Sequence, residues 1–424
     1  MTALDLSLLP DSAHVSDGGR LAIGGFDLLD LAEVHGTPLF VYDENHIRER
    51  CRQAVTALGD TAVYAAKAFL CRAMARLAHE EGMRLDVSTL GELAVAMAAG
   101  VPPERLVMHG NNKSDTELRA ALDAAVGVIV VDSFDELGRL QQMVDSTDQE
   151  PPQIMLRITP GVEAHTHEFI RTGHDDSKFG FTVSSGAAAE AVRRAQESPL
   201  VDLLGIHAHI GSQVFRAESF AEAVEVVAGF TGPRGLDELS IGGGLGVPYV
   251  AGEAAPTISE WAEVINVGAR RAGYEGRLWA EPGRAIVASA AITLYRVGTI
   301  KDLPGIRTYV AVDGGMSDNP RPVLYGSGYE AFLPRATRAE RPRRVRIVGK
   351  HCESGDILVR EASVPRDLRV GDILATPVTG AYGHSMGSNY NKVLRPPVVF
   401  VADGEARLVV RRETISDLLA TDVG

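Results

Sequence analysis

Polar or glycine-rich groups follow almost every short apolar run between residues 60 and 285. If these runs are parallel strands, the groups lie at the strand ends where barrel enzymes carry their chemistry. In chain order they are Lys67, Asp86 with Ser88, His109 with Asn111, Asp132, Arg157, His207 with His209, Gly242 to Gly244, and Glu281 with Arg284. The sequence therefore predicts a single site assembled from strand ends.

Lys67 is the candidate nucleophile of this group. It lies in the segment YAAKAF, at the end of the first predicted strand and in an apolar setting. A lysine in such a place can simply extend its ammonium group past the barrel rim into water. The functional alternative is a desolvated lysine that forms a Schiff base with a carbonyl compound.

A glycine-rich turn, IGGGLGVPY, follows the seventh predicted strand. Gly242, Gly243, Gly244 and Gly246 leave backbone N–H groups free to approach a phosphate. The spacing is not that of a dinucleotide-binding fingerprint, because Val247 stands where the last glycine is needed. Barrels often bind phosphate with the loops after strands seven and eight, and this turn is in that position.

Glu281, in AEPGRAI, ends the eighth predicted strand, where a buried carboxylate is costly unless it is paired. It could form a structural pair with Arg284, or it could hold the protonated ring nitrogen of pyridoxal phosphate and make that ring an electron sink. The segment HAHIGS adds the ring of His209 and the hydroxyl of Ser212. Together with Lys67 and the glycine turn, these residues favour pyridoxal phosphate.

The elements that position these residues alternate regularly. Strands are predicted near residues 62–67, 85–88, 105–109, 127–132, 153–159, 203–209, 238–242 and 277–281, with amphipathic helical stretches between them. Strict strand–helix alternation indicates a parallel sheet, and eight strands are the number that closes into a (β/α)8 barrel of the TIM type. An open, doubly wound sheet is the alternative.

The pattern changes after residue 290 to short alternating segments broken by Gly and Pro. This is typical of an all-β domain with mostly antiparallel strands, a sandwich or Greek-key arrangement. We therefore predict a barrel over residues 39–290 and a β domain made from residues 1–38 and 291–424. The stretch from Gly161 to Phe181 is too long for a plain connection and is predicted to be functional or to form a lid.

Composition limits the possible functions. The chain has 424 residues and a net charge of −14, which argues against a nucleic-acid partner or an acidic membrane surface. Three cysteines cannot form a disulfide framework, which indicates a reducing compartment. No signal peptide or apolar run of about 20 residues is apparent. We expect a cytoplasmic protein.

Several motifs carry a resemblance to a known family. They include GTPLFVYDE, HGNNKS, GVEAHTHEF, GIHAHIGSQVF, DGGMSDNPRPVLYG and GKHCESGDI, and they extend over nearly the whole chain. The sequence resembles the fold-type III pyridoxal-phosphate decarboxylases, in the form common in actinobacteria that acts on diaminopimelate. The resemblance implies loss of CO2 from meso-2,6-diaminoheptanedioate to give L-lysine, the last step of lysine biosynthesis.

The resemblance also implies residue roles for the cofactor. Lys67 would carry the cofactor, His209 would stack on its ring and Glu281 would pair with the ring nitrogen. The phosphate would be held by Ser212, Gly243, Gly244, Gly283 and Arg284.

Further residues are implied for the substrate. It would be bound by Arg284, Arg321, Tyr325, Glu353 and Tyr382, with Tyr382 also near the cofactor. Cys352 would donate the proton, and Cys352 and Glu353 would come from the partner subunit of a homodimer with shared active sites. From the residue type alone, without the resemblance, Cys352 is predicted to be a small buried apolar residue, although its polar neighbours make a buried position less expected. The segment GHSMGSNYN after Tyr382 is individual to this chain and is not expected to touch a catalytic position.

Other functions remain open from the residues. A related enzyme could act on ornithine, arginine or a secondary metabolite, or could racemise an amino acid. The pairs His165-x-His167 and His207-x-His209 could hold a metal ion for hydrolysis. A non-catalytic homologue is the third alternative, and the complete set of Lys67, Glu281 and Cys352 argues against it.

Overall fold

The computed structural model describes residues 5–146, 150–161 and 176–424. The chain forms two compact units. The first, here called the β unit, comprises Met1–Glu49, Pro248–Ala254 and Ile286–Gly424. The second, the barrel unit, comprises Arg50–Val247 and Ala255–Ala285. Most of the stretch from Gly161 to Phe181, including His165 and His167, lies outside the described residues.

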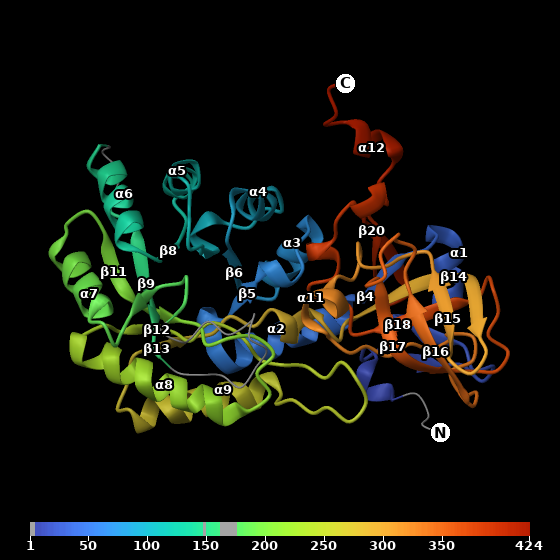
Figure 1. The fold of residues 1–424 in the computed structure, drawn as a ribbon. Helices are drawn as coiled ribbons and strands as arrows, with labels where there is room; N and C mark the ends of the chain where they lie inside the picture. Colours follow the sequence, from blue (N-terminus) through green and yellow to red (C-terminus); the bar gives the residue numbers. More distant parts are fainter. Residues whose placement is uncertain (1–4, 147–149, 162–175) are drawn as a thin grey trace. The chain divides into compact units, whose positions relative to one another are not determined.

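Eight parallel strands form the barrel unit (Figure 1). They are β5 (Val63–Ala65), β6 (Arg84–Val87), β7 (Leu106–Met108), β8 (Val128–Val131), β9 (Gln153–Thr159), β11 (Asp202–Ala208), β12 (Glu238–Ser240) and β13 (Arg277–Trp279). Neighbouring strands follow one another in this order. A parallel bridge between Ala62 and Ala280 joins the last strand to the first. The predicted (β/α)8 barrel is thus confirmed, and the doubly wound sheet is excluded.

Helices alternate with these strands along the chain. They are α2 (Glu44–Leu58), α3 (Arg72–Glu80), α4 (Leu90–Ala98), α5 (Asp115–Asp123), α6 (Phe134–Asp145), α7 (Ala187–Glu197), α8 (Ala217–Thr231), α9 (Ile258–Arg271) and the short α10 (Arg284–Val287). Ser114 and Thr257 begin α5 and α9 with capping boxes. A short strand, β10 (Phe181–Thr182), pairs with β9. Valines at positions 63, 107, 128 and 130 pack with Trp279 in a buried cluster.

The β unit contains two sheets. One is formed by β4 (Leu39–Asp43), β14 (Ala291–Leu303), β15 (Arg307–Val312), β16 (Arg343–Val348), β17 (Ile357–Val364), β18 (Ile373–Pro377), β19 (Val398–Ala402) and β20 (Glu405–Val410). The other is formed by β1 (His14–Val15), β2 (Leu21–Ile23) and β3 (Phe26–Asp27). Most pairs are antiparallel, as predicted, but β15 with β16 and β4 with β19 are parallel. Helices α1 (Leu28–His35), α11 (Arg321–Tyr325) and α12 (Ile415–Leu419) complete the unit.

The position of β4 differs from the predicted division. Residues 39–43 were expected in the barrel, but β4 pairs with β14 on one side and β19 on the other. All five of its residues are buried, including Asp43 at its end, so burial does not alternate along the segment. Such a segment fits the centre of a mixed sheet as well as a barrel strand, which is why periodicity did not separate the two.

No helix within the described residues is both long enough and apolar enough to cross a membrane.

Candidate active site

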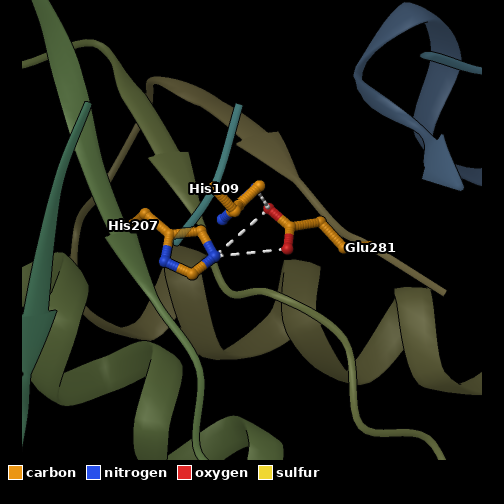
Figure 2. A group of neighbouring side chains, drawn as sticks. All are labelled: His109, His207 and Glu281. Atoms are coloured by element: carbon orange, nitrogen blue, oxygen red, sulfur yellow. Dashed lines mark hydrogen bonds and ion pairs between the residues drawn. The ribbon is translucent and has the colours of Figure 1, made fainter. Parts of the chain in front are cut away.

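The carboxylate of Glu281 is the centre of a buried cluster at the strand ends of the barrel unit. Glu281 follows β13, and its oxygens lie 3.2 Å from Nε2 of His207, on β11. The hydroxyl of Ser240, on β12, donates a 2.8 Å hydrogen bond to the same carboxylate. Nε2 of His109, which follows β7, lies 3.6 Å from Oε1. Figure 2 shows both imidazoles directed toward the carboxylate, and their ring centroids are 4.9 Å apart.

The surroundings keep this carboxylate ionised. Burial by itself raises the pKa of Glu281, but the His207 and His109 rings and the Ser240 hydroxyl outweigh it and hold the pKa well below its ordinary value. Burial also lowers the pKa of His109 well below its ordinary value, against the opposing charge of Glu281. The hydrogen bond to a carboxylate assigns the proton of His207 to Nε2. The cluster is therefore a buried anion able to hold a protonated ring nitrogen.

The same three side chains meet a geometric condition for metal binding. One ligand atom from each of His109, His207 and Glu281 lies within 4.8 Å of the others. His209 is not part of this group, because its Nδ1 accepts the Gly243 N–H at 3.2 Å. The predicted His207-x-His209 metal pair is thus not formed: His209 lies beyond the end of β11, and its Nδ1 faces the Gly243 N–H instead of Glu281.

The glycine turn after β12 passes very close to its neighbours. A Cβ on Gly243 would lie 2.2 Å from the carbonyl oxygen of Glu281, and one on Gly244 would lie 2.3 Å from that of Gly211. Gly244 also has a φ of +118°, which side chains rarely allow. Only glycine therefore fits these positions, and the bare backbone lies at the barrel rim next to Glu281.

Three further predicted cofactor residues lie in the barrel unit. Arg284 is buried and its Nη2 donates a 2.9 Å hydrogen bond to the Ser212 hydroxyl. Gly283 packs so closely on the first strand that a Cβ would lie 2.9 Å from Ala65. The alternative pair of Glu281 with Arg284 is not what the structure has: the hydrogen bonds of Glu281 go to His207 and Ser240.

Lys67 follows β5 in a turn of 3-10 helix, Ala66–Ala68. Both alanines are buried, but the lysine side chain is exposed. The buried alanines anchor the turn that carries Lys67, and its role as a Schiff-base lysine stays a prediction. Its charge nevertheless acts on the site. Burial raises the pKa of Asp86 to about 7, against the opposing positive charge of Lys67.

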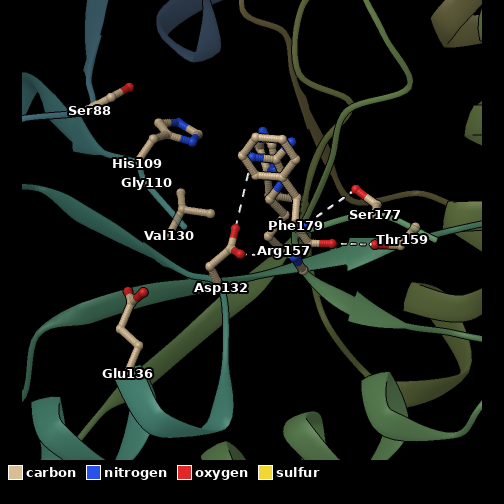
Figure 3. Close-up of polar contacts among 12 residues, drawn as sticks. Ser88, His109, Gly110, Val130, Asp132, Glu136, Arg157, Thr159, Ser177 and Phe179 are labelled. Atoms are coloured by element: carbon tan, nitrogen blue, oxygen red, sulfur yellow. Dashed lines mark hydrogen bonds and ion pairs between the residues drawn. The ribbon is translucent and has the colours of Figure 1, made fainter. Parts of the chain in front are cut away.

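Two rim residues hold the chain where it returns to the barrel before β10. The Asp132 carboxylate accepts the Gly180 N–H at 2.9 Å and lies 3.9 Å from the guanidinium of Arg157. That guanidinium lies over the Phe179 ring, 4.1 Å from its centroid (Figure 3). Asp132 and Arg157 were predicted as site residues by position. In the structure their contacts hold the backbone and the ring at the rim of the barrel.

A fully buried ion pair lies behind the loop that carries His109. The ammonium of Lys113 donates to Glu136 at 2.7 Å and to the carbonyls of Gly110 and Val130 at 2.8 and 2.6 Å. Burial lowers the pKa of Lys113, and Glu136 opposes that effect. The pair ties the His109 loop to β8 and α6, and no signal in the sequence singled it out.

The β unit carries the predicted substrate residues. Arg321 begins α11 and is buried between tyrosines, with its guanidinium carbon 4.1 Å from the Tyr249 ring centroid and Nη1 donating to the Tyr329 hydroxyl at 2.8 Å. Its Nε is buried, and no described atom accepts its hydrogen. No carboxylate in the described part of the chain forms an ion pair with it. A buried cation among neutral rings is suited to an anionic ligand.

The remaining predicted residues of the β unit are more open. Tyr325 and Tyr382 are half-buried, and Tyr382 has a φ of 58°. Cys352 and Glu353 lie exposed in the connection between β16 and β17. Burial of Cys352 as a small apolar residue is thus excluded, because polar neighbours surround it on a tight loop.

Comparison with known proteins agrees with this arrangement. Residues 44–288 match the family model described as "Pyridoxal-dependent decarboxylase, pyridoxal binding domain". Diaminopimelate decarboxylase of Mycobacterium tuberculosis is 48% identical, with 98% of this chain and 97% of the relative covered. That of Bacillus subtilis is 46% identical, with 98% of each covered.

Among solved structures, diaminopimelate decarboxylase from M. jannaschii in complex with L-lysine matches with a TM-score of 0.91. It is 33% identical, and 98% of each chain is covered. The chain belongs to the diaminopimelate decarboxylase family of pyridoxal-dependent decarboxylases.

Proposed function

We propose that this chain converts meso-2,6-diaminoheptanedioate to L-lysine and CO2, with pyridoxal phosphate as its cofactor. The observation that carries this proposal is the buried, ionised Glu281, held by His207 and Ser240 at the rim of the barrel. Pyridoxal phosphate, when bound, supplies an electron sink for the carbon that loses CO2. An ionised carboxylate at the ring nitrogen is the protein group that this chemistry needs, and family membership independently supports the same reading.

The residues of the barrel unit fit this cofactor. Glu281 offers a buried anion for the ring N–H, and His209 is fixed for ring stacking by the Gly243 N–H. Lys67 is the residue we assign to the covalent bond with the cofactor's aldehyde. The side chains and bare backbone that we assign to the phosphate are those of Ser212, Gly243, Gly244, Gly283 and Arg284.

The substrate has two ends of opposite configuration, and we assign the loss of CO2 to the D-configured end. The other end keeps its carboxylate, and Arg321 is the residue we assign to it, because this guanidinium is buried among neutral tyrosines. Arg284, Tyr325 and Tyr382 are assigned to the same substrate. Glu353 is assigned to the distal ammonium. A substrate that lacks the distal carboxylate would leave the buried charge of Arg321 unpaired, which explains strong discrimination.

Cys352 is the proposed proton donor to the carbon that has lost CO2. Its exposed thiol can reach a partner molecule, and we propose a homodimer in which Cys352 and Glu353 serve the active site of the partner subunit. As an enzyme of amino-acid biosynthesis, the protein is proposed to work in the cytoplasm.

Steady-state assays of lysine and CO2 formation test the substrate. We expect turnover of meso-diaminopimelate and at least a hundredfold lower kcat/KM for ornithine, arginine and L-lysine, because each lacks a group that the site pairs. Equal turnover of ornithine would favour the related-decarboxylase alternative. If a chelator abolishes the activity and added pyridoxal phosphate does not support it, a metal hydrolase is favoured.

Mixing inactive subunits tests the shared site. A Lys67→Ala chain and a Cys352→Ala chain are each expected to be inactive. If the sites are shared, random exchange of subunits restores about a quarter of wild-type activity, because half the dimers contain one intact site. No recovery after proven subunit exchange would contradict the shared arrangement.

A further inference from the structure

The loop that carries Cys352, residues 349–356 between β16 and β17, is held in shape by Asp356. One carboxylate oxygen of Asp356 accepts the His351 N–H at 2.9 Å, and the other accepts the Met316 N–H at 2.7 Å. The Gly349 N–H donates to the carbonyl of Asp356 at 3.0 Å. The loop is thus closed on itself and tied to the segment before α11, while Cys352 at its tip stays exposed.

Asn391 contacts this loop from a distant part of the chain. Its Oδ1 accepts the backbone N–H of Cys352 at 3.2 Å and lies 3.3 Å from Nδ1 of His351. Since Oδ1 of Asn391 accepts the Cys352 N–H, the carboxamide oxygen and not its NH2 group faces the His351 ring. An oxygen can only accept here, so Nδ1 of His351 must carry the hydrogen. Nε2 of His351 is then an acceptor, and the Ser317 hydroxyl donates to it at 2.9 Å. One consistent set of protons therefore links Ser317, His351, Asn391 and the amide of Cys352.

The backbone of Asn391 supports a specific role. Its φ and ψ are 51° and 23°, in the left-handed region, where asparagine is tolerated better than most residues but still at a cost. His351 is buried, and the ring of Tyr390 packs against it at 5.3 Å between centroids. The conformation thus places the carboxamide under the Cys352 loop. Asn391 belongs to the segment GHSMGSNYN, for which the sequence predicted no contact with a catalytic position, so that expectation is wrong.

We propose that Asn391 is a positioning residue that holds Cys352 for proton delivery, acting together with His351. The proposal rests on the proposed function, in which the Cys352 thiol is the proton donor. The sulfur is separated from the backbone by a single rotatable side-chain bond, so fixing the Cys352 amide limits the thiol to a few positions. A displacement of about 1 Å can cost about 100-fold in rate.

Paired substitutions at one position test the carboxamide oxygen. Asn391→Gly removes the oxygen but allows the same positive φ, so the backbone is not strained. Asn391→Asp keeps an acceptor oxygen and nearly the same shape. We expect the glycine variant of the holoenzyme to lose about 10- to 100-fold in kcat with KM changed less than about twofold. The aspartate variant should stay within about threefold of wild type.

A matched control lies two residues away. Asn389 bonds away from Cys352: its Nδ2 donates to the Val393 carbonyl at 3.0 Å and to the Glu413 carboxylate, 24 residues further along the chain, at 2.6 Å. Asn389→Ala therefore disturbs the same stretch without touching Cys352, and kcat should not change. Ser317→Ala unties His351 from its far side and should lower kcat in the same direction by a smaller factor, which provides a second test if Asn391→Gly does not fold.

The solvent deuterium isotope effect on kcat separates positioning from general loosening. If proton delivery is slowed, the ratio of kcat in H2O to that in D2O should rise in Asn391→Gly above the wild-type ratio, and Asn391→Asp should restore it. A glycine variant with wild-type kcat, or an aspartate variant as impaired as glycine, would overturn the proposal.

The Cys352→Ser variant tests the proton-donor role of Cys352 separately from the positioning role of Asn391. If Cys352→Ser is impaired and Asn391→Gly is not, the positioning role is wrong and the proton-donor role stands. If Cys352→Ser keeps full activity, the proton-donor role is wrong, and the positioning proposal falls with it.

Discussion

Nε2 of His207 lies 3.2 Å from the carboxylate of Glu281, although the strands that carry them, β11 and β13, are separated by β12. The intervening strand completes the contact, because Ser240 at the end of β12 donates to the same carboxylate. Three successive barrel strands thus hold one buried anion. Its position depends on the closed barrel rather than on any flexible loop, and its charge is kept by hydrogen bonds rather than by a neighbouring arginine.

Replacing Glu281 by glutamine should lower kcat by about 10- to 100-fold, the equivalent of one charge-assisted hydrogen bond. The amide keeps the size and a hydrogen-bonding oxygen, so cofactor content should fall much less than kcat. The measurement is kcat with saturating pyridoxal phosphate, alongside the absorbance of bound cofactor. Wild-type turnover by a Glu281→Gln enzyme of full cofactor content would exclude the assigned role.

Arg321→Met should raise KM for meso-diaminopimelate by about 10- to 100-fold, because the distal carboxylate loses a charged hydrogen-bond partner. L-Lysine keeps that carboxylate, so its inhibition constant should rise in parallel. Cadaverine lacks the carboxylate and serves as the matched control, with unchanged inhibition. Tyr329→Phe removes only the neutral acceptor of the Arg321 Nη1 hydrogen and should change KM less than about tenfold. Equal effects on L-lysine and cadaverine would contradict the assignment.

The stability of the β unit should fall as pH rises through the range set by Asp318. Burial raises the pKa of Asp318 to about 7, although the hydroxyl of Tyr295 and the Gly315 N–H oppose it. An unfolded aspartate titrates near pH 4. Between about pH 4 and 7 the unfolded chain has released this proton and the folded chain has kept it, so the free energy of unfolding decreases with rising pH.

Urea denaturation of wild type and Asp318→Asn at pH 4.5 and pH 7 isolates this effect. The asparagine variant does not titrate at this position. Between the two pH values its free energy of unfolding should therefore rise relative to that of wild type by about 3 kcal/mol. Parallel pH profiles for the two proteins would show that Asp318 is ionised when folded.

Lys113→Met should lower the free energy of unfolding by about 3–5 kcal/mol, because Glu136 would be left buried without its cation. The double variant Lys113→Met with Glu136→Leu removes both charges and should recover much of that loss. Urea unfolding of both variants measures the difference. A single variant within about 1 kcal/mol of wild type would mean that the pair contributes little.

The barrel and most of its site residues could be predicted because strand ends in a (β/α)8 barrel converge by geometry. His109, His207 and Glu281 were identified by position alone, and the structure brings all three together. Their division of roles could not be predicted. His109 and His207 face the carboxylate of Glu281, whereas His209 faces the Gly243 N–H. The sequence pattern does not report the direction of a side chain at a strand end, so this difference was not predictable.

Features that depend on distant chain segments were missed. Residues 39–43 were placed in the barrel domain, but β4 pairs with β14 and β19, which lie more than 240 residues further along the chain. Asn391 was overlooked because its contact with Cys352 joins residues 39 positions apart, and sequence periodicity does not report such contacts. The Lys113–Glu136 pair was missed because a lysine and a glutamate on amphipathic segments usually mark solvent-exposed faces.

The central claim is that Lys67 carries the cofactor with which the enzyme forms lysine. The most direct measurement is to reduce the holoenzyme with borohydride, digest it and locate the pyridoxyl group by mass spectrometry. We predict a single modified peptide containing Lys67, with lysine formation lost in proportion to its modification. A pyridoxyl group on Lys113 or Lys178, or an unmodified enzyme that still forms lysine, would contradict the account.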